Sequence, residues 1–125
     1  MGMALKGNFF TVETCNPLND SVEYSIRLNP ENIIYKAHFP GKPITPGVCL
    51  VQIALELLEL YTGKTLRLSE AKNVKFVSIL SPLENVVVNC TFSRMEVDAK
   101  VLKTQALVRN HKGIFAKMSL IFEKK

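Results

Sequence analysis

The stretch that decides the fold runs Gly47-Val48-Cys49-Leu50-Val51-Gln52-Ile53-Ala54-Leu55-Glu56-Leu57-Leu58-Glu59-Leu60-Tyr61. Its length and the position of Gly63 predict one helix that ends at that glycine. The polar residues Gln52, Glu56 and Glu59 have the spacing i, i+4, i+7 and form one narrow stripe, whereas the other sides are apolar. A helix that is apolar on nearly all sides is buried, so we expect the stripe to face solvent, a cleft or a second subunit.

Six shorter segments alternate or concentrate β-branched and aromatic residues, which predicts strands. Turn-forming residues separate them, and the last three follow one another closely enough for an antiparallel meander. The economical way to bury the helix is to wrap an antiparallel sheet around it, which is an α+β fold of the hotdog type. The predicted strands are 9–15, 21–28, 74–79, 85–92, 101–108 and 113–122.

Length and composition indicate one globular domain over 1–125, because 125 residues with 47% hydrophobic and 22% charged residues suffice for a single core. The net charge of +5 comes from scattered basic residues and favours an acidic partner. No nucleic-acid-binding motif is present, and no segment approaches the ~20 apolar residues of a membrane span. We therefore expect neither a nucleic-acid partner nor a membrane span.

The three cysteines, Cys15, Cys49 and Cys90, lie far apart and form no CxxC pair. This spacing suggests neither a zinc site nor a disulfide framework, and we expect each cysteine to be a small core residue. A thiol beside a helix start, as Cys49 would be, can also act as a nucleophile, but core packing is the favoured interpretation. We expect no metal and no organic cofactor, and a reducing cytoplasm fits best.

Directly before the helix lies the run His38-Phe39-Pro40-Gly41-Lys42-Pro43-Ile44-Thr45-Pro46-Gly47. Its prolines and glycines predict a rigid, non-helical loop, and Pro46-Gly47 starts the helix with its first amide groups free. Free amides at a helix start are suited to polarise a carbonyl oxygen. A histidine held just upstream can accept or donate a proton near neutral pH.

This run is similar to the signature of the bacterial 3-hydroxyacyl-acyl carrier protein dehydratases, in which His-Phe-Pro-Gly-x-Pro-x-x-Pro-Gly-Val precedes the central hotdog helix. Every fixed position is met from His38 to Val48. The segment Lys75-Phe76-Val77-Ser78-Ile79-Leu80-Ser81-Pro82 also resembles the strand after that helix. Length and strand order agree from about Ser21 to the C-terminus.

The resemblance implies that His38 removes the C2 proton of a 3-hydroxyacyl thioester and that the amide of Gly47 or Val48 polarises the thioester carbonyl. It also implies a homodimer, with higher oligomers left open, and an acyl carrier protein as partner. Basic residues that could meet this acidic partner are Lys36, Lys42, Arg67, Lys72 and Lys75. The acyl chain would enter an apolar tunnel near the dimer interface, for which the candidate residues are Phe39, Pro46, Phe76 and Ile79.

The helix departs from the family pattern at two positions. Gln52 stands where the family has a catalytic glutamate, and Glu56 stands where it often has a glutamine one turn later. Glutamine has no titratable proton to give, and one helical turn displaces Glu56 by about 5.4 Å. Both residues remain site candidates, whereas a solvated position is the simpler account of Glu59.

Three hypotheses follow for the activity. In the first, dehydration survives, with His38 carrying most of the proton transfer and Gln52 positioning the hydroxyl or a water. In the second, the protein is a hotdog thioesterase in which this helix orients an attacking water. In the third, the chain binds an acyl group or an acyl carrier protein without catalysis. The complete loop signature favours the first.

Overall fold

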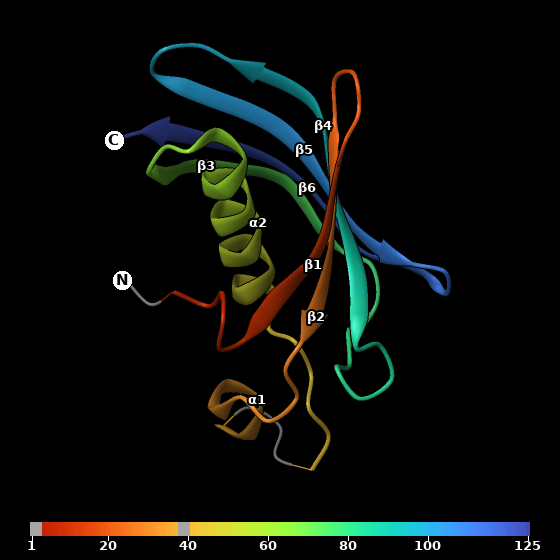
Figure 1. Cartoon of the computed structure of the whole chain (residues 1–125). Coiled ribbons are helices and arrows are strands. Elements are labelled where there is room, and N and C mark those ends of the chain that lie inside the picture. The colour runs from red at the N-terminus through yellow and green to blue at the C-terminus, as the bar shows by residue number, and fades with distance from the viewer. Residues whose placement is uncertain (1–3, 38–40) are drawn as a thin grey trace.

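The structure is a computed structural model that describes residues 4–37 and 41–125. It contains an antiparallel six-stranded sheet in the order β1-β2-β4-β5-β6-β3, and Figure 1 shows α2 lying against one face of this sheet. This arrangement confirms the predicted α+β fold and the meander of the last three strands. The elements are β1 (Phe10–Pro17), β2 (Val22–Leu28), α1 (Ile33–Ala37), α2 (Gly47–Thr62), β3 (Leu66–Phe76), β4 (Val87–Val97), β5 (Val101–Asn110) and β6 (Gly113–Lys124).

Helix α2 forms where the apolar pattern predicted it, from Gly47 to Thr62. Gly63 ends it in the left-handed conformation, with φ 69°, and donates its N–H to the carbonyl oxygen of Glu59 at 2.9 Å. The absence of a Cβ lets glycine adopt this conformation without strain. No helix within the described ranges is long and apolar enough to cross a membrane.

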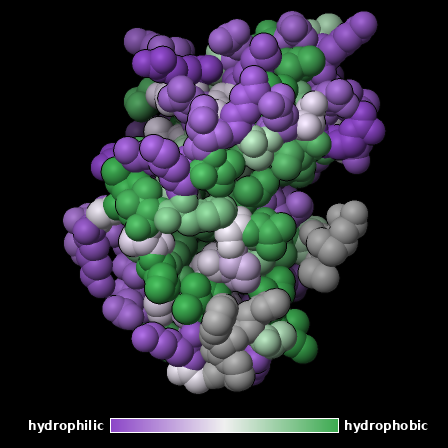
Figure 2. Space-filling view, turned by 180° about the vertical axis from the view of Figure 1, so that it is seen from behind, coloured by the Kyte–Doolittle hydropathy of each residue, from purple (hydrophilic) through white to green (hydrophobic). Residues whose placement is uncertain are grey.

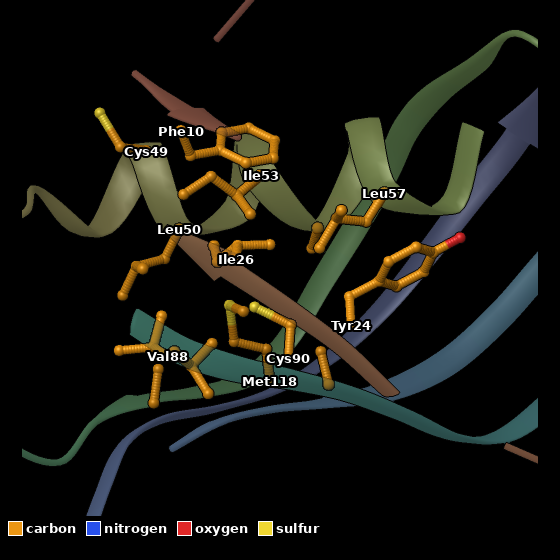
Figure 3. Close-up of a cluster of buried hydrophobic side chains, with 14 of the residues drawn as sticks. Phe10, Tyr24, Ile26, Cys49, Leu50, Ile53, Leu57, Val88, Cys90 and Met118 are labelled. Atoms are coloured by element: carbon orange, nitrogen blue, oxygen red, sulfur yellow. The ribbon is translucent and has the colours of Figure 1, made fainter. Parts of the chain in front are cut away.

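The core lies between α2 and the sheet. Figure 3 shows Leu50, Ile53 and Leu57 of α2 in one buried cluster with Ile26 and Val88 of the sheet. Complete burial of one leucine or isoleucine side chain stabilises a fold by about 1.5–3 kcal/mol. The apolar faces of α2 therefore hold it against the sheet. This packing also fixes the direction in which the polar stripe of the helix faces.

The strand predicted at 74–79 differs from the observed strand β3, which begins at Leu66 and ends at Phe76. β3 lies at an edge of the sheet, where β6 is its single partner within the described part of the chain, and most of its side chains are exposed. Its central residues Ser69 to Asn73 are polar apart from Ala71, and they show no regular alternation of apolar and polar side chains. Backbone pairing, interrupted by two irregularities in register, forms this strand where the side-chain pattern gave no indication of one.

The cysteines are distributed differently from the prediction. Cys49 and Cys90 are buried, as expected, but Cys15 is exposed, so the prediction that it is a core residue was wrong. Cys15 lies on β1, an edge strand whose residues beyond Phe10 and Val12 are exposed. A cysteine is small and apolar, but its residue type does not predict whether it lies on the buried or the exposed face of an edge strand.

Candidate active site at the start of helix α2

The predicted site residues His38 and Phe39 lie outside the described residues, but the chain on both sides of them is described. Before them, Tyr35 is buried on α1, and its ring stacks on Phe9 with 4.7 Å between the ring centroids. After them, Thr45 is buried and its N–H donates to the carbonyl oxygen of Leu80 at 2.8 Å. The run from His38 to Pro46 is called the histidine loop below. The chain is therefore fixed to the body of the protein at both ends of this loop.

A hydrogen bond joins these two ends directly. The hydroxyl oxygens of Tyr35 and Thr45 lie 2.8 Å apart. Burial raises the pKa of the Tyr35 hydroxyl well above its ordinary value, although the bond with Thr45 acts in the opposite direction. Tyr35 is therefore a neutral structural group that closes the base of the loop, a role that its place before His38 did not reveal.

Helix α2 begins as the sequence predicted. Pro46 is extended, with φ −64° and ψ 144°, and no side chain of residues 4–37 or 41–125 caps the helix. The N–H of Cys49 donates to the carbonyl oxygen of Pro46 at 3.0 Å, so the amides of Gly47 and Val48 precede the first helical hydrogen bond. The Val48 side chain is 74% exposed. Both amides are suited to polarise an oxygen atom at this end of the helix.

An apolar cavity of about 340 Å³ opens at the helix start. Four predicted site residues meet there, because Pro46, Gly47, Phe76 and Ile79 all line it, together with Leu50 and others. The Phe76 ring lies so close to Gly47 that a Cβ atom there would stand 2.5 Å from the nearest ring carbon. Only glycine leaves room for the ring against the helix start.

Hydrophobic surface extends beyond this cavity. Phe76, Val77 and Ile79 are all more than half exposed. Figure 2 shows hydrophobic side chains gathered across the middle of the face opposite to the view of Figure 1, below a hydrophilic upper part. An apolar cavity that continues into apolar surface is suited to receive an acyl chain or a second subunit.

Cys49 is an unsuitable nucleophile, in agreement with the favoured interpretation of the sequence. Its side chain is buried, and burial raises the pKa of its thiol. Because the thiolate is the reactive form, a raised pKa lowers reactivity. The chemistry at the helix start therefore falls to the loop and to the backbone amides.

The polar stripe of α2 is more enclosed than the sequence suggested. Glu56 is only 7% exposed, since the N-terminal segment covers it. Its carboxylate accepts the N–H of Leu5 at 2.8 Å (Oε2) and that of Lys6 at 2.7 Å (Oε1). It also accepts the Nε2 amino group of Gln52 at 2.8 Å. No pattern in the sequence pointed to the two backbone donors, because they are 51 and 50 residues away from Glu56.

Gln52 lies half-buried at a second cavity, of about 610 Å³, between α2 and the beginning of β3. As far as the structure describes the chain, this cavity and the one at the helix start have no lining residue in common, and Val48 lines neither. Glu59 accepts the N–H of Leu66 at 2.8 Å and ties the helix to β3. The cavity is lined by Ala4, Gln52, Leu55, Glu56, Glu59, Thr65, Leu66, Arg67, Leu68 and Lys125.

Known proteins are similar to this chain in sequence or in fold. The family model named ApeI-like, described as ApeI dehydratase, matches residues 14–112. The 3-hydroxyacyl-acyl-carrier-protein dehydratase FabZ of Clostridium acetobutylicum is 28% identical over 118 residues, which cover 88% of this chain and 82% of that protein. FabZ of Latilactobacillus sakei is 27% identical over 97 residues, covering 72% and 69%.

Solved structures show the same fold at lower identity. The dehydratase heterocomplex ApeI:P from Xenorhabdus doucetiae matches with a TM-score of 0.70 and 15% identity, covering 90% of this chain and 96% of that one. A thioesterase from Haemophilus influenzae matches with a TM-score of 0.67 and 12% identity, covering 99% and 83%. The family match over residues 14–112 decides between these neighbours. The chain is a hotdog-fold protein that belongs to the ApeI-like dehydratase family.

Proposed function

We propose that this protein removes water from a 3-hydroxyacyl thioester carried by an acyl carrier protein. One observation carries the proposal: the histidine loop leads directly into a helix start with free Gly47 and Val48 amides, and Gly47 lines an apolar cavity there. A thioester needs an amide donor for its carbonyl and an apolar space for its chain, and both occur together here. The FabZ relatives carry this substrate class in their names.

In this mechanism His38 removes the proton from C2 while the amide of Gly47 or Val48 donates a hydrogen bond to the thioester carbonyl oxygen. The electrons of the C2–H bond form the C2–C3 double bond, and the C3–O bond breaks. The leaving hydroxyl takes the proton from His38, so that water departs and the histidine returns to its neutral form. Gln52 holds the hydroxyl by hydrogen bonds, since it has no proton to give.

The acyl chain would lie in the cavity at the helix start, against Phe76 and Ile79. Pro46 lines the same cavity, and Phe39 follows His38 in the loop. The carrier protein would approach over basic residues such as Lys42 and Lys75, both exposed, because acyl carrier proteins are acidic. A cytoplasmic location is supported by the three free cysteines.

A test of the function follows two products at once. The protein is incubated with 3-hydroxyacyl-acyl carrier proteins of several chain lengths, and enoyl absorbance and free thiol are recorded together. Dehydration predicts enoyl formation without thiol release. Thiol release without enoyl formation would make the protein a thioesterase, and binding without either product would make it a non-catalytic acyl-carrier-binding subunit.

We further propose a homodimer formed along β3, in which Gln52 of one subunit meets the histidine loop of the other. The support is the edge of β3, whose backbone groups on one side have no neighbouring strand among the described residues. An uncovered edge strand readily pairs with a second chain. Leu68 on this strand is 36% exposed and lines the cavity that contains Gln52.

Replacing Leu68 with aspartate should convert the dimer into a monomer, because it places a charge at the proposed contact. Light scattering after size exclusion should give about twice 14.0 kDa for the parent chain and 14.0 kDa for the variant. Leu18→Asp is the matched control, since Leu18 is 56% exposed and follows β1, at the opposite edge of the sheet. Loss of the dimer in the Leu18 variant, or its persistence in the Leu68 variant, would contradict this interface.

Replacing Gly47 with alanine should lower kcat about tenfold, because the new Cβ pushes the Phe76 ring into the cavity that would hold the acyl chain. Phe76 is 54% exposed, so its ring can move and the cost in stability should stay near 1 kcal/mol. The second substitution Phe76→Ala removes the overlap and should restore kcat in the double variant. A double variant as slow as Gly47→Ala alone would show that the ring is not the cause.

A further inference from the structure

Glu56 is a buried acidic residue that the proposed proton transfers do not use. It stands on α2 between Gln52 and the N-terminal residues Leu5 and Lys6, and it binds all three. Oε1 accepts the Lys6 N–H at 2.7 Å, and Oε2 accepts the Leu5 N–H and the Gln52 amino group, each at 2.8 Å. The Leu5 N–H also lies 3.1 Å from Oε1.

These contacts fix the direction of the Gln52 amide. Backbone N–H groups only donate, so Leu5 and Lys6 hold the Glu56 carboxylate as an acceptor. A carboxylate accepts from Gln52 only if the glutamine turns its amino group, and not its carbonyl oxygen, toward Glu56. The carbonyl oxygen of Gln52 is then directed away from Glu56. Because Gln52 and Glu56 line one cavity, the residue at position 56 decides which end of the Gln52 amide is available there.

We propose that Glu56 is a positioning residue that turns the Gln52 carbonyl oxygen toward the hydroxyl of a substrate held at the histidine loop of the second subunit, and this rests on the proposed dehydration and the proposed dimer. The hydroxyl would then donate its hydrogen to Gln52, and a lone pair of its oxygen would remain free for the proton from His38. C3–O cleavage with that proton gives water, so the step needs no acid on α2. The carboxylate acts only through Gln52.

The same contacts explain why Glu56 accompanies Gln52. A glutamine at position 56 would offer one carbonyl oxygen to the two backbone donors of Leu5 and Lys6. It would also accept or donate toward Gln52 with equal ease, so that the direction of the Gln52 amide would no longer be fixed. The charge at position 56 is thus coupled both to the N-terminal segment and to the orientation of the group at position 52.

The first test needs no substrate. Gln52 and Gln105 are the two glutamines of the chain, so their side-chain amide signals are readily assigned by nuclear magnetic resonance. In the parent protein the two amide protons of Gln52 should be widely separated in chemical shift, because one of them donates to a carboxylate. Glu56→Gln should bring them together, whereas Glu59→Gln should leave them unchanged. Equal behaviour of the two variants would overturn the proposed orientation.

Glu59→Gln is a matched control because Glu59 also lies on α2 and also accepts a backbone N–H, that of Leu66. It lies a full seven positions after Gln52, whereas Glu56 lies at the hydrogen-bonding distance i+4. Both substitutions remove one negative charge and weaken one tie of the helix. They differ in whether a side chain bonded to Gln52 is changed.

The second test measures turnover of 3-hydroxyacyl-acyl carrier protein. Glu56→Gln should lower kcat about tenfold and change KM little, a loss that matches one hydrogen bond. In a Gln52→Leu background the same substitution should have no further effect on kcat, because the amide that it orients is gone. An equal loss of kcat in the parent and in the Gln52→Leu background would show that Glu56 has a purely structural role. The comparison stays valid even if Glu56→Gln lowers the stability of the protein, because both backgrounds carry the same substitution. Absence of turnover in the parent chain would contradict the proposed function, while the resonance test would still decide the orientation.

Discussion

Replacing His38 with asparagine should lower kcat for dehydration about 1000-fold, because the variant lacks the group that takes the proton from C2 and returns it to the leaving hydroxyl. Positioned general acid–base groups contribute about 10²–10⁴-fold to a rate. Here a single side chain carries both transfers, since Gln52 cannot supply a proton. Enoyl absorbance from 3-hydroxyacyl-acyl carrier protein measures the rate. The melting temperature should change little, because the loop is fixed at its base by Tyr35 and Thr45.

His111→Asn is the matched control for that experiment, since the chain has two histidines and His111 is exposed in the turn between β5 and β6. It should retain full turnover. If His38→Asn kept more than a tenth of the parent kcat, proton transfer by His38 would be excluded. If both histidine variants lost turnover, the effect would have to be assigned to something other than the loop.

Replacing Glu56 with alanine should lower the free energy of unfolding by about 3 kcal/mol. The substitution removes the acceptor of two backbone N–H groups, those of Leu5 and Lys6. Leu5 is buried, with only 5% of its surface exposed. A buried donor left without a partner costs about 1–3 kcal/mol, and hydrogen bonds to charged groups are at the upper end. Urea unfolding of the full chain measures the change. Hydrogen exchange should also accelerate at the amides of Leu5 and Lys6.

Glu59→Ala provides the comparison for this loss of stability. It removes the acceptor of one backbone N–H, that of Leu66, so its cost should be about 1 kcal/mol. A Glu56→Ala variant no less stable than Glu59→Ala would mean that the N-terminal segment is weakly held. The proposal that Glu56 couples this segment to Gln52 would then lose its structural basis.

The sequence identified the features that depend on local chemistry. The apolar pattern predicted helix α2 and its end near Gly63, and the spacing of the last strands predicted their meander. Pro46 and Gly47 predicted the helix start with free amides. Each of these features follows from periodicity or from the backbone limits of proline and glycine. The residues Pro46, Gly47, Phe76 and Ile79 line one cavity, and their roles toward a substrate stay predictions.

The sequence failed where pairing or packing across the chain overrides the local pattern. Most side chains of β3 are exposed and its centre is largely polar, so its backbone hydrogen bonds to β6 make it a strand. Cys15 has a core-like side chain on an edge strand, and nothing local shows which way it points. The bond between Tyr35 and Thr45 joins residues on either side of the histidine loop, whose closure local preferences do not specify.

The helix itself separates the two kinds of information. Its sequence determined that α2 is buried and that Gln52 and Glu56 share one stripe, because a helical period of 3.6 residues places i and i+4 on the same face. Only the tertiary structure decided that Glu56 is covered, since its backbone partners Leu5 and Lys6 come from the far end of the chain. Backbone N–H groups are present at nearly every residue, so no sequence pattern distinguishes the two that a buried carboxylate will bind.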